Sequence, residues 1–350
     1  MTENHTPVAP SSPEEGSPPS KERPGAPSPA VVVLAAGQGT RMRSSLPKVL
    51  HEVMGRSMLA HVLNAARYLE PDPLIVITGY EHELVEEAAL SFGAQFARQH
   101  ERLGTGHAVK CAAPLLSGRE GPVIIVPGDV PLLSPQTLID FFDAHRALQA
   151  DLSLLTVRLD YPGAYGRAIR DASGWLEKVV EARDASESEL RVDEVNSGVY
   201  AADGPKLLEA LDELKPENDQ KEYYLTDAVE IFRKKGYRAA AIEGPDPAEL
   251  QGVNDRRELA LAQAALRERI NLSWLLAGVT MADPSTAHIE ASVKLSRDVT
   301  LGQGVILAGS TFVGVGAVIG PYSCLKDVIV APGAVVPPHQ NLEGVEVSGV

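Results

Sequence analysis

The chain has 350 residues, of which 44% are hydrophobic and 23% charged, and its formal net charge is −15. This length suggests two or three domains, each with enough apolar residues for a core of its own. The acidic balance argues against general nucleic-acid binding, which normally needs a basic surface, and favours small anionic ligands held by a few local cations.

Residues 1–29 are rich in proline and serine and have almost no large apolar side chains. We expect a disordered tail there, without the apolar stretch of a signal peptide. No later apolar run is long enough to span a membrane, and Cys111 and Cys324 lack metal-ligand spacing. These features predict a cytoplasmic protein that does not bind membranes and has two reduced thiols.

Short apolar segments alternate with amphipathic ones across residues 30–255. This alternation predicts an α/β domain with a mostly parallel, Rossmann-like sheet covered on both faces. We expect strands at residues 31–34, 74–78, 123–126, 152–159 and 195–201, and a helix in residues 58–69. Ligands of such sheets bind beyond the carboxyl ends of the strands, so we expect the loops after Leu34, Val126 and Ala201 to converge.

A glycine-rich turn within residues 34–48 follows the first expected strand directly, carries Arg41 and ends at Lys48. Gly37 and Gly39 allow the main chain to approach a phosphate, and two cations seven residues apart, Arg41 and Lys48, can hold a polyphosphate between them. The spacing matches neither a P-loop nor a dinucleotide-binding motif. It predicts a nucleotidyltransferase-like loop, although glycine-rich turns without a ligand are also common.

Asp129 follows the expected strand at residues 123–126, which places a carboxylate at the end of a central strand. Mg²⁺ prefers one or two hard protein oxygens together with phosphate oxygens and water. Asn254, just before a long expected helix, is a candidate for the second oxygen. For Asn254 alone, the residue pattern favours a helix N-cap, and an aspartate in a loop is often a turn or capping residue.

Further polar residues lie beside glycines or expected strand ends. Gly104 and Thr105 open a helix, and Gln99 carries the donor and acceptor that complement a uracil edge. Each of these residues, like the later Glu181 and Asn196, also has an ordinary interpretation as a cap, turn or surface residue.

Residues 256–277 are expected to form one helix within a connecting segment, residues 256–284. In residues 285–350, seven aliphatic residues then recur at a period of six, which predicts a short hexapeptide-repeat β-helix of about three coils and a C-terminal tail. Glycines at the corners of the coils are Gly302, Gly314, Gly316 and Gly320, and the periodic residues are Ile289, Leu295, Leu301, Leu307, Val313, Ile319 and Leu325.

The order of these motifs resembles that of bacterial N-acetylglucosamine-1-phosphate uridylyltransferases, over residues 31 to about 325. The resemblance implies a Rossmann-like nucleotidyltransferase domain, a connecting helix and the first part of a left-handed β-helix. The segments that carry it are Leu34-Ala-Ala-Gly-Gln-Gly-Thr-Arg-Met, Leu46-Pro-Lys-Val-Leu-His, Gln99, Leu103-Gly-Thr-Gly-His-Ala, Gly128-Asp-Val-Pro-Leu, Tyr165-Gly-Arg, Val180-Glu, Asn196-Ser-Gly, Glu222-Tyr-Tyr-Leu-Thr-Asp and Gly252-Val-Asn.

Carried over by position, the resemblance implies an enzyme that uses UTP, N-acetylglucosamine-1-phosphate and Mg²⁺ to make UDP-N-acetylglucosamine, a cell-wall precursor. Arg41 and Lys48 would neutralise phosphates, while Asp129 and Asn254 would hold Mg²⁺. The implied substrate-binding residues are Leu34, Ala35, Ala36 and Gly37 under the nucleotide, Gln99, Gly104 and Thr105 at the uridine, and Gly166, Glu181 and Asn196 at the sugar and ribose.

The sequence departs from this family at two positions of the candidate site. Gln38 lies where a lysine is frequent, and Pro127 lies where a hydrogen-bonding side chain is frequent.

The β-helix of the family also continues beyond Val350 into coils that carry an acetyl-coenzyme A site, so we expect no acetyltransferase activity. Stacked β-helices often trimerise, so we expect a homotrimer formed through the β-helix. Alternatives are another sugar-1-phosphate or nucleotide as substrate, and a non-catalytic module that binds UDP-sugars.

Overall fold

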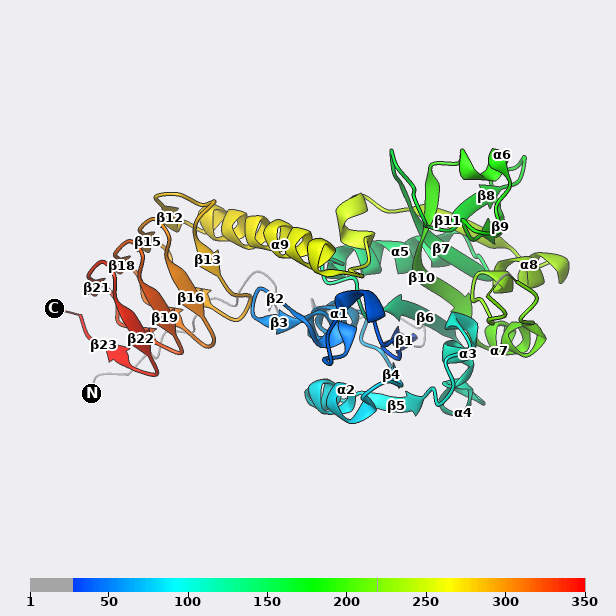
Figure 1. Cartoon of the computed structure of the whole chain (residues 1–350), viewed down its shortest axis with the longest axis horizontal. Helices are drawn as coiled ribbons and strands as arrows, with labels where there is room; N and C mark the ends of the chain where they lie inside the picture. Colours follow the sequence, from blue (N-terminus) through cyan, green and yellow to red (C-terminus); the bar gives the residue numbers. More distant parts are fainter. Residues whose placement is uncertain (1–27, 219, 350) are drawn as a thin grey trace. The chain divides into compact units, whose positions relative to one another are not determined.

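The computed structural model describes residues 28–218 and 220–349, and the expected disordered tail lies outside them except for Ser28 and Pro29 (Figure 1). The described chain forms two compact units. The first contains residues 28–51 and Ser57–Glu258, and the second contains Glu52–Arg56 and residues 259–349. Within the described residues, no helix combines the length and the apolar character that a membrane crossing requires.

The first unit is built on one sheet, with nine strands in the described part of the chain. Seven of them lie in the order β11-β7-β10-β6-β1-β4-β5, β8 pairs with the start of β10, and β9 pairs with β8. All five strands expected from the sequence are present. The strands are β1 (Ala30–Leu34), β4 (Leu74–Thr78), β5 (Gln95–Arg98), β6 (Pro122–Pro127), β7 (Leu152–Arg158), β8 (Arg167–Arg170), β9 (Leu176–Val180), β10 (Glu194–Asp203) and β11 (Ala239–Glu243).

The direction of β10 corrects one expectation. Strands β1, β4, β5 and β6 are parallel, but β10 runs antiparallel to both β6 and β7. Asp203 at the end of β10 therefore pairs with Pro122 at the start of β6, so the loop after Ala201 lies at the edge away from the carboxyl ends. The start of β10, which carries Asn196, takes its place there, because an antiparallel strand presents its amino end to that edge.

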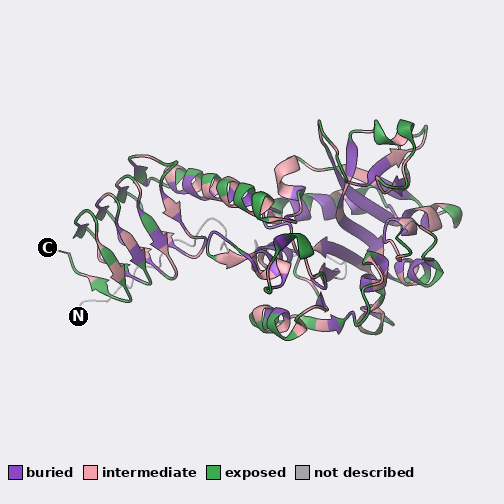
Figure 2. Cartoon of the chain, viewed as in Figure 1, coloured by how far each residue is buried: buried purple, intermediate pink, exposed green. Residues whose placement is uncertain are grey.

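Helices cover both faces of the sheet, and the strands between them are buried (Figure 2). Along β1, Val32 faces one apolar cluster, and Val31 and Val33 face the other. This double burial explains why β1 is an uninterrupted apolar run. The helices are α1 (Met58–Arg67), α2 (His82–Ala89), α3 (Thr105–Lys110), α4 (Ala113–Leu116), α5 (Pro135–Ala147), α6 (Glu187–Leu190), α7 (Gly204–Glu213) and α8 (Asp227–Lys234), with 3-10 turns η1 (Thr40–Met42), η2 (Lys48–Leu50), η3 (Leu90–Phe92) and η4 (Pro247–Leu250).

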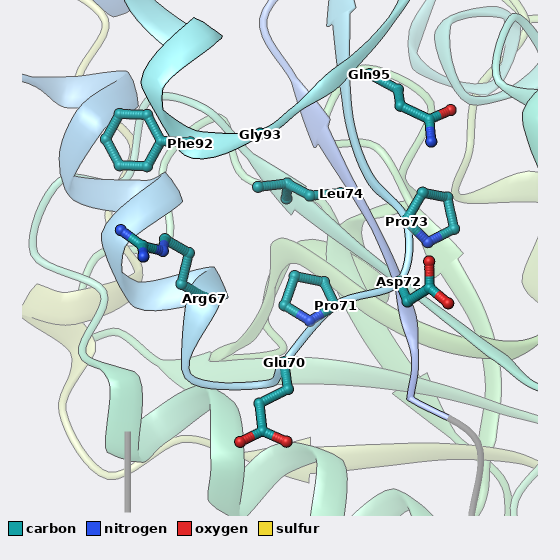
Figure 3. A pocket seen from close by; sticks show the side chains of 9 residues that line it. All are labelled: Arg67, Glu70, Pro71, Asp72, Pro73, Leu74, Phe92, Gly93 and Gln95. Atoms are coloured by element: carbon teal, nitrogen blue, oxygen red, sulfur yellow. The ribbon is translucent and has the colours of Figure 1, made fainter. Parts of the chain in front are cut away.

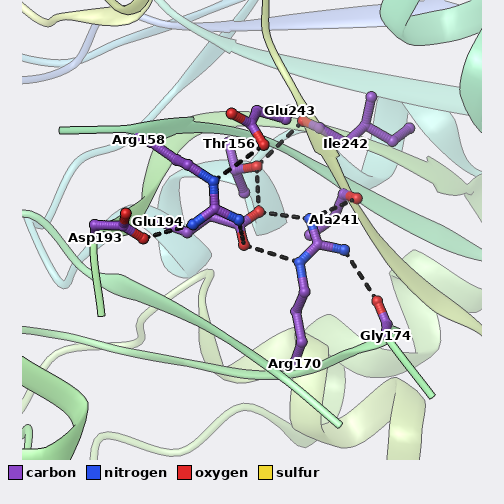
Figure 4. Close-up of polar contacts among 9 residues, drawn as sticks. All are labelled: Thr156, Arg158, Arg170, Gly174, Asp193, Glu194, Ala241, Ile242 and Glu243. Atoms are coloured by element: carbon purple, nitrogen blue, oxygen red, sulfur yellow. Dashed lines mark hydrogen bonds and ion pairs between the residues drawn. The ribbon is translucent and has the colours of Figure 1, made fainter. Parts of the chain in front are cut away.

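A buried carboxylate fixes the start of β10 (Figure 4). Arg170 Nε and Nη2 donate to the two oxygens of Glu194 at 2.8 and 2.6 Å, and Thr156 Oγ1 donates to Glu194 Oε1 at 2.7 Å. Burial by itself would raise the pKa of Glu194, but the hydrogen bonds from Arg170 and Thr156 outweigh burial and lower it. Strands β7, β8 and β10 are thereby tied together two residues before Asn196.

The second unit contains the helix α9 (Arg256–Leu276), as predicted, and a left-handed β-helix. Each of its three faces is a parallel sheet with four strands in the described residues, so the stack is longer than the three coils expected. The strands are β12 (Thr280–Met281), β13 (His288–Ile289), β14 (Lys294–Leu295), β15 (Thr300–Leu301), β16 (Ile306–Ala308), β17 (Phe312–Val313), β18 (Val318–Ile319), β19 (Cys324–Lys326), β20 (Ile329–Val330), β21 (Val335–Val336), β22 (Asn341–Glu343) and β23 (Glu346–Val347).

The six-residue spacing ends at Leu325 because the next inward residue is Val330, one position early. Val336 and Leu342 then follow at the step of six, and Val347 again comes one position early, so a search for one unbroken period of six stops at Leu325. A hairpin from an earlier part of the sequence, β2 (Glu52–Val53) and β3 (Arg56–Ser57), belongs to this unit as far as Arg56, and Ala291 N donates to Met54 O at 3.0 Å. The turn that contains Lys48 is thus followed directly by a hairpin anchored on the β-helix.

Three of the predicted corner glycines lie against a proline of the next coil. A Cβ atom added at Gly302 would lie 2.5 Å from Pro321 N, and one at Gly320 would lie 2.5 Å from Pro338 N. Gly314 faces Pro332 in the same way, with 2.6 Å to its nitrogen. The corners therefore require glycine because the main chain of the following coil occupies the space of a side chain.

We predict that Gly302→Ala destabilises the β-helix by about 2–3 kcal/mol, because the backbone of the next coil must move away. Gly316→Ala is the matched control: its Cβ would meet nothing within 4 Å, and its φ of +70° costs about 1 kcal/mol. Urea-induced unfolding followed by circular dichroism measures both free energies. Equal losses in the two variants would contradict the packing argument.

Candidate active site

Two cations and two oxygen-bearing side chains from distant parts of the sequence meet at the carboxyl edge of the sheet. The Lys48 ammonium contacts Asp129 Oδ2 and donates to Asn254 Oδ1 at 3.2 Å. Arg41 Nη2 donates to the same Asn254 oxygen at 3.0 Å. The side chains of Lys48 and Asp129 are 15% and 19% exposed, so their charges interact in a partly desolvated site.

Local backbone geometry holds these side chains together. Gly39 has a φ of +67°, and a Cβ atom there would lie 2.5 Å from the Cβ of Lys48, so only glycine lets Lys48 lie across the loop. Gly128 N donates to Leu34 O at 2.9 Å, and Val253 N donates to Asp129 O at 2.9 Å. Main-chain hydrogen bonds thus link the glycine-rich loop, the loop after β6 and the segment before α9.

The structure decides between the two interpretations of Asn254. The cap at the start of α9 comes from its neighbour, because Asp255 Oδ1 accepts a hydrogen bond from Glu258 N at 2.8 Å. The Asn254 side chain instead accepts from Arg41 and Lys48. The capping interpretation favoured for Asn254 alone is therefore wrong, since Asp255 has that role.

Asp129 and Asn254 are the residues of this cluster that could hold a divalent cation. Both present a hard oxygen to the same ammonium group, which marks a position that a cation can occupy. In the described residues, no group of three or more His, Cys, Asp or Glu lies close enough to bind a metal. A cation here would depend on substrate phosphate oxygens and water for its remaining ligands, which fits Mg²⁺.

The candidate uridine residues lie together around the turn before α3. Gln99 is buried, and its Nε2 donates to Gly104 O at 3.0 Å and lies 3.1 Å from His107 Nδ1. Thr105 Oγ1 accepts from Leu225 N at 3.1 Å, and Tyr223 N donates to Leu103 O at 2.7 Å. Main-chain N–H groups of residues 223–225 therefore hold this turn in place by hydrogen bonds.

The three candidate sugar residues also meet. Asn196 N donates to Gly166 O at 2.9 Å, and a Cβ atom at Gly166 would lie 3.4 Å from each carboxylate oxygen of Glu181. Asn196 Oδ1 accepts from Gly198 N at 2.8 Å and from Tyr200 Oη at 3.2 Å. Asn196 is thus a structural turn former as well as a candidate ligand.

Four acidic residues make this part of the site electrostatically unusual. Burial, and then the nearby Asp184 and Asp227, raise the pKa of Glu181. Burial, with Glu230 and Asp184, raises the pKa of Asp227 to about 6. Raised carboxyl pKa values often accompany binding sites because burial and like charges are both costly.

Sequence reasoning missed two residues that support the site. His107 contacts Gln99, and Tyr200 is a buried hydroxyl donor to Asn196. Their signal is weak, because a helical histidine and a strand tyrosine are usually packing residues. Pro127, one of the two departures from the family, lies against Gly198. A Cβ atom added at Gly198 would lie 2.8 Å from Pro127 Cγ.

A pocket of about 420 Å³ lies elsewhere, where Pro71–Leu74 lead into β4 and Gly93 leads into β5 (Figure 3). Arg67 and Glu70 from the end of α1 line it as well. Because these are the amino ends of parallel strands, this pocket is at the edge opposite to Asp129 and Lys48. It does not belong to the candidate site.

Comparisons with known proteins place the chain among nucleotide-using enzymes. Residues 31–197 match the MobA-like NTP transferase domain family. The "Bifunctional protein GlmU" of Streptococcus suis is 40% identical to this chain, and the match covers 91% of this chain and 69% of that protein. The "Bifunctional protein GlmU" of a Cyanothece strain is 41% identical, and the match covers 90% of this chain and 72% of that protein. The chain thus spans about two thirds of the length of these relatives.

Among solved structures, UDP-glucose pyrophosphorylase complexed with UDP-glucose is similar with a TM-score of 0.55 and 18% identity, over 69% of this chain and 99% of that one. This likeness shows that the two chains share a fold. The nucleotidyltransferase fold predicted from the sequence is confirmed.

The pKa of Asp227 generates a prediction about stability. Its folded-state value of about 6 exceeds the ordinary 3.8, so protonation favours the folded state and ionisation costs stability as pH rises from about 4 to 6. We expect Asp227→Asn to gain stability relative to the wild type by about 1 kcal/mol over this range, after allowance for solvent screening. Urea unfolding at pH 4, 5, 6 and 7 measures the difference, and a constant difference would contradict the assignment.

Proposed function

Because the chain belongs to the family of the bifunctional GlmU proteins, we propose that it transfers the uridylyl group of UTP to N-acetylglucosamine-1-phosphate. The products are UDP-N-acetylglucosamine and pyrophosphate. The observation that carries this proposal is the convergence of Lys48 and Arg41 on Asn254 Oδ1, with Asp129 on the same ammonium group. Two cations lie here beside two oxygens that would hold a metal ion. Such a site can offset the repulsion between two anionic phosphates and bring them together for reaction.

In the proposed reaction, an oxygen of the sugar phosphate attacks the α-phosphorus of UTP. A phosphorus–oxygen bond forms as the bond between the α- and β-phosphates breaks, and pyrophosphate leaves with the electron pair. The attacking oxygen is already an anion, so no general base is needed. Arg41 and Lys48 would neutralise charge on the phosphates, and Asp129 and Asn254 would hold Mg²⁺, which supplies further neutralisation when bound.

The other candidate residues would position the substrates. Leu34, Ala35, Ala36 and Gly37 would lie under the nucleotide. Gln99, Gly104 and Thr105 would contact the uridine, which the contacts between Gln99 and Gly104 support. Gly166, Glu181 and Asn196 would contact the sugar and ribose, supported by the bond between Asn196 N and Gly166 O.

We also propose that the chain forms a homotrimer through the β-helix. Its proposed location is the cytoplasm. Outward-facing apolar residues stack on adjacent coils, such as Val318 on Val335 and Phe312 on Ile329. Val318, Val335 and Ile329 are more than a third exposed. Stacked apolar columns of this kind are suited to contact with another copy of the chain. The absence of acetyl transfer stays a prediction.

A pyrophosphate-release assay with Mg²⁺ tests the proposal. We expect UTP with N-acetylglucosamine-1-phosphate to exceed dTTP or GTP and glucose-1-phosphate. Lys48→Ala should lower kcat by about 10²–10³-fold because one phosphate contact is lost. The control is Lys215→Ala, because this exposed lysine pairs with Glu217 at the surface.

Near wild-type turnover in Lys48→Ala would discredit the assigned site. Preference for another nucleotide or sugar phosphate would support the first alternative. Binding of UDP-N-acetylglucosamine without any pyrophosphate release would identify a non-catalytic binding module.

A further inference from the structure

A contact between two loops brings an additional cation to the glycine-rich loop. Arg102 Nη1 donates to Gln38 Oε1 at 2.6 Å, although the two residues are 64 positions apart. Arg102 belongs to the loop between β5 and α3, and Gln38 belongs to the turn after β1. This hydrogen bond connects the loop expected to lie under the nucleotide with the loop that carries Gln99 and Gly104.

The charge of Arg102 is not neutralised by a carboxylate. Among the ion pairs within the described chain, none involves Arg102, whereas the nearby Arg98 pairs with Glu86 at 3.3 Å. The partner of Arg102 is the neutral amide oxygen of Gln38, which orients the guanidinium without cancelling its charge. Arg102 is exposed, so its other N–H groups can reach an anion.

The surroundings of Arg102 indicate which anion this is. Arg102, Gln99 and Gly79 line a cavity of about 250 Å³. A Cβ atom at Gly79 would lie 2.8 Å from Ala36 O, so the cavity borders the main chain of the glycine-rich loop. Gln99 in turn contacts Gly104. A uridine held by Gln99 and Gly104 would carry its phosphates past Arg102 toward Gly37 and Arg41.

We propose that Arg102, oriented by Gln38, is a third cation for the phosphate tail of the nucleoside triphosphate, supplied by the loop that contacts the base. The proposal rests on the proposed function, because it takes that site as the nucleotide site. A neutral glutamine at position 38 thus serves the phosphate site through the arginine that it holds. Charge-assisted bonds from a guanidinium to phosphate are strong and directional.

Isothermal titration calorimetry at low ionic strength, comparing UTP with uridine in the presence of Mg²⁺, tests this role. We expect Arg102→Ala to weaken UTP binding about tenfold and to leave uridine binding within twofold, because uridine has no phosphate. Gln38→Ala should weaken UTP binding less, because the charge remains but is no longer oriented. The effect should shrink in high salt, since the group is exposed.

Two further variants keep the test specific. The double variant Arg102→Ala with Gln38→Lys should recover most of the UTP affinity, because the charge then comes from the glycine-rich loop itself. Arg297→Ala is the control: this exposed arginine belongs to the β-helix and does not line the cavity of Arg102, so we expect little change in UTP affinity.

Equal weakening by Arg297→Ala, no recovery in the double variant, or parallel loss of uridine binding would each overturn the role of Arg102. The outcome is separable from that of the proposed function. Pyrophosphate release with unchanged UTP affinity in Arg102→Ala would refute only the further inference. Phosphate-dependent UTP binding that needs Arg102, without pyrophosphate release, would refute only the enzymatic proposal.

Discussion

The site depends on one shared ammonium group. Lys48 contacts Asp129 and Asn254, and Arg41 joins it on the amide oxygen of Asn254. These four side chains come from three loops at the carboxyl edge of the sheet, and each loop is fixed by main-chain hydrogen bonds to a neighbour. The arrangement keeps two cations close together, at a place where like charges would otherwise separate, because the oxygens of Asp129 and Asn254 offset their repulsion.

A rigid scaffold supports this arrangement. Glu194 is buried and satisfied by Arg170 and Thr156, which fixes the start of β10 and therefore the position of Asn196. Removing one partner of a buried ion pair is strongly destabilising, so the network around Glu194 favours a single geometry of this edge.

The sequence predicted the elements better than their directions. Apolar runs gave all five strands, and the period of six gave the β-helix, because both patterns reflect burial along one segment. The antiparallel direction of β10 was not predictable, since pairing is decided by residues far away. The same limit applied at single residues: Asn254 was interpreted alone as a cap because only the fold shows that Asp255 caps α9. The contact of Gln38 with Arg102 likewise has no signal in the sequence.

Without nucleotide, the Lys48 ammonium group lies on the oxygens of Asp129 and Asn254, the two residues proposed to hold Mg²⁺. The most direct test is calorimetric titration of Mg²⁺ alone into the wild-type chain and into Lys48→Met. Because the ammonium group competes with and repels Mg²⁺, the account predicts about tenfold tighter Mg²⁺ binding in Lys48→Met, and loss of that binding when Asp129→Asn is added. Equal or weaker binding in Lys48→Met would contradict it.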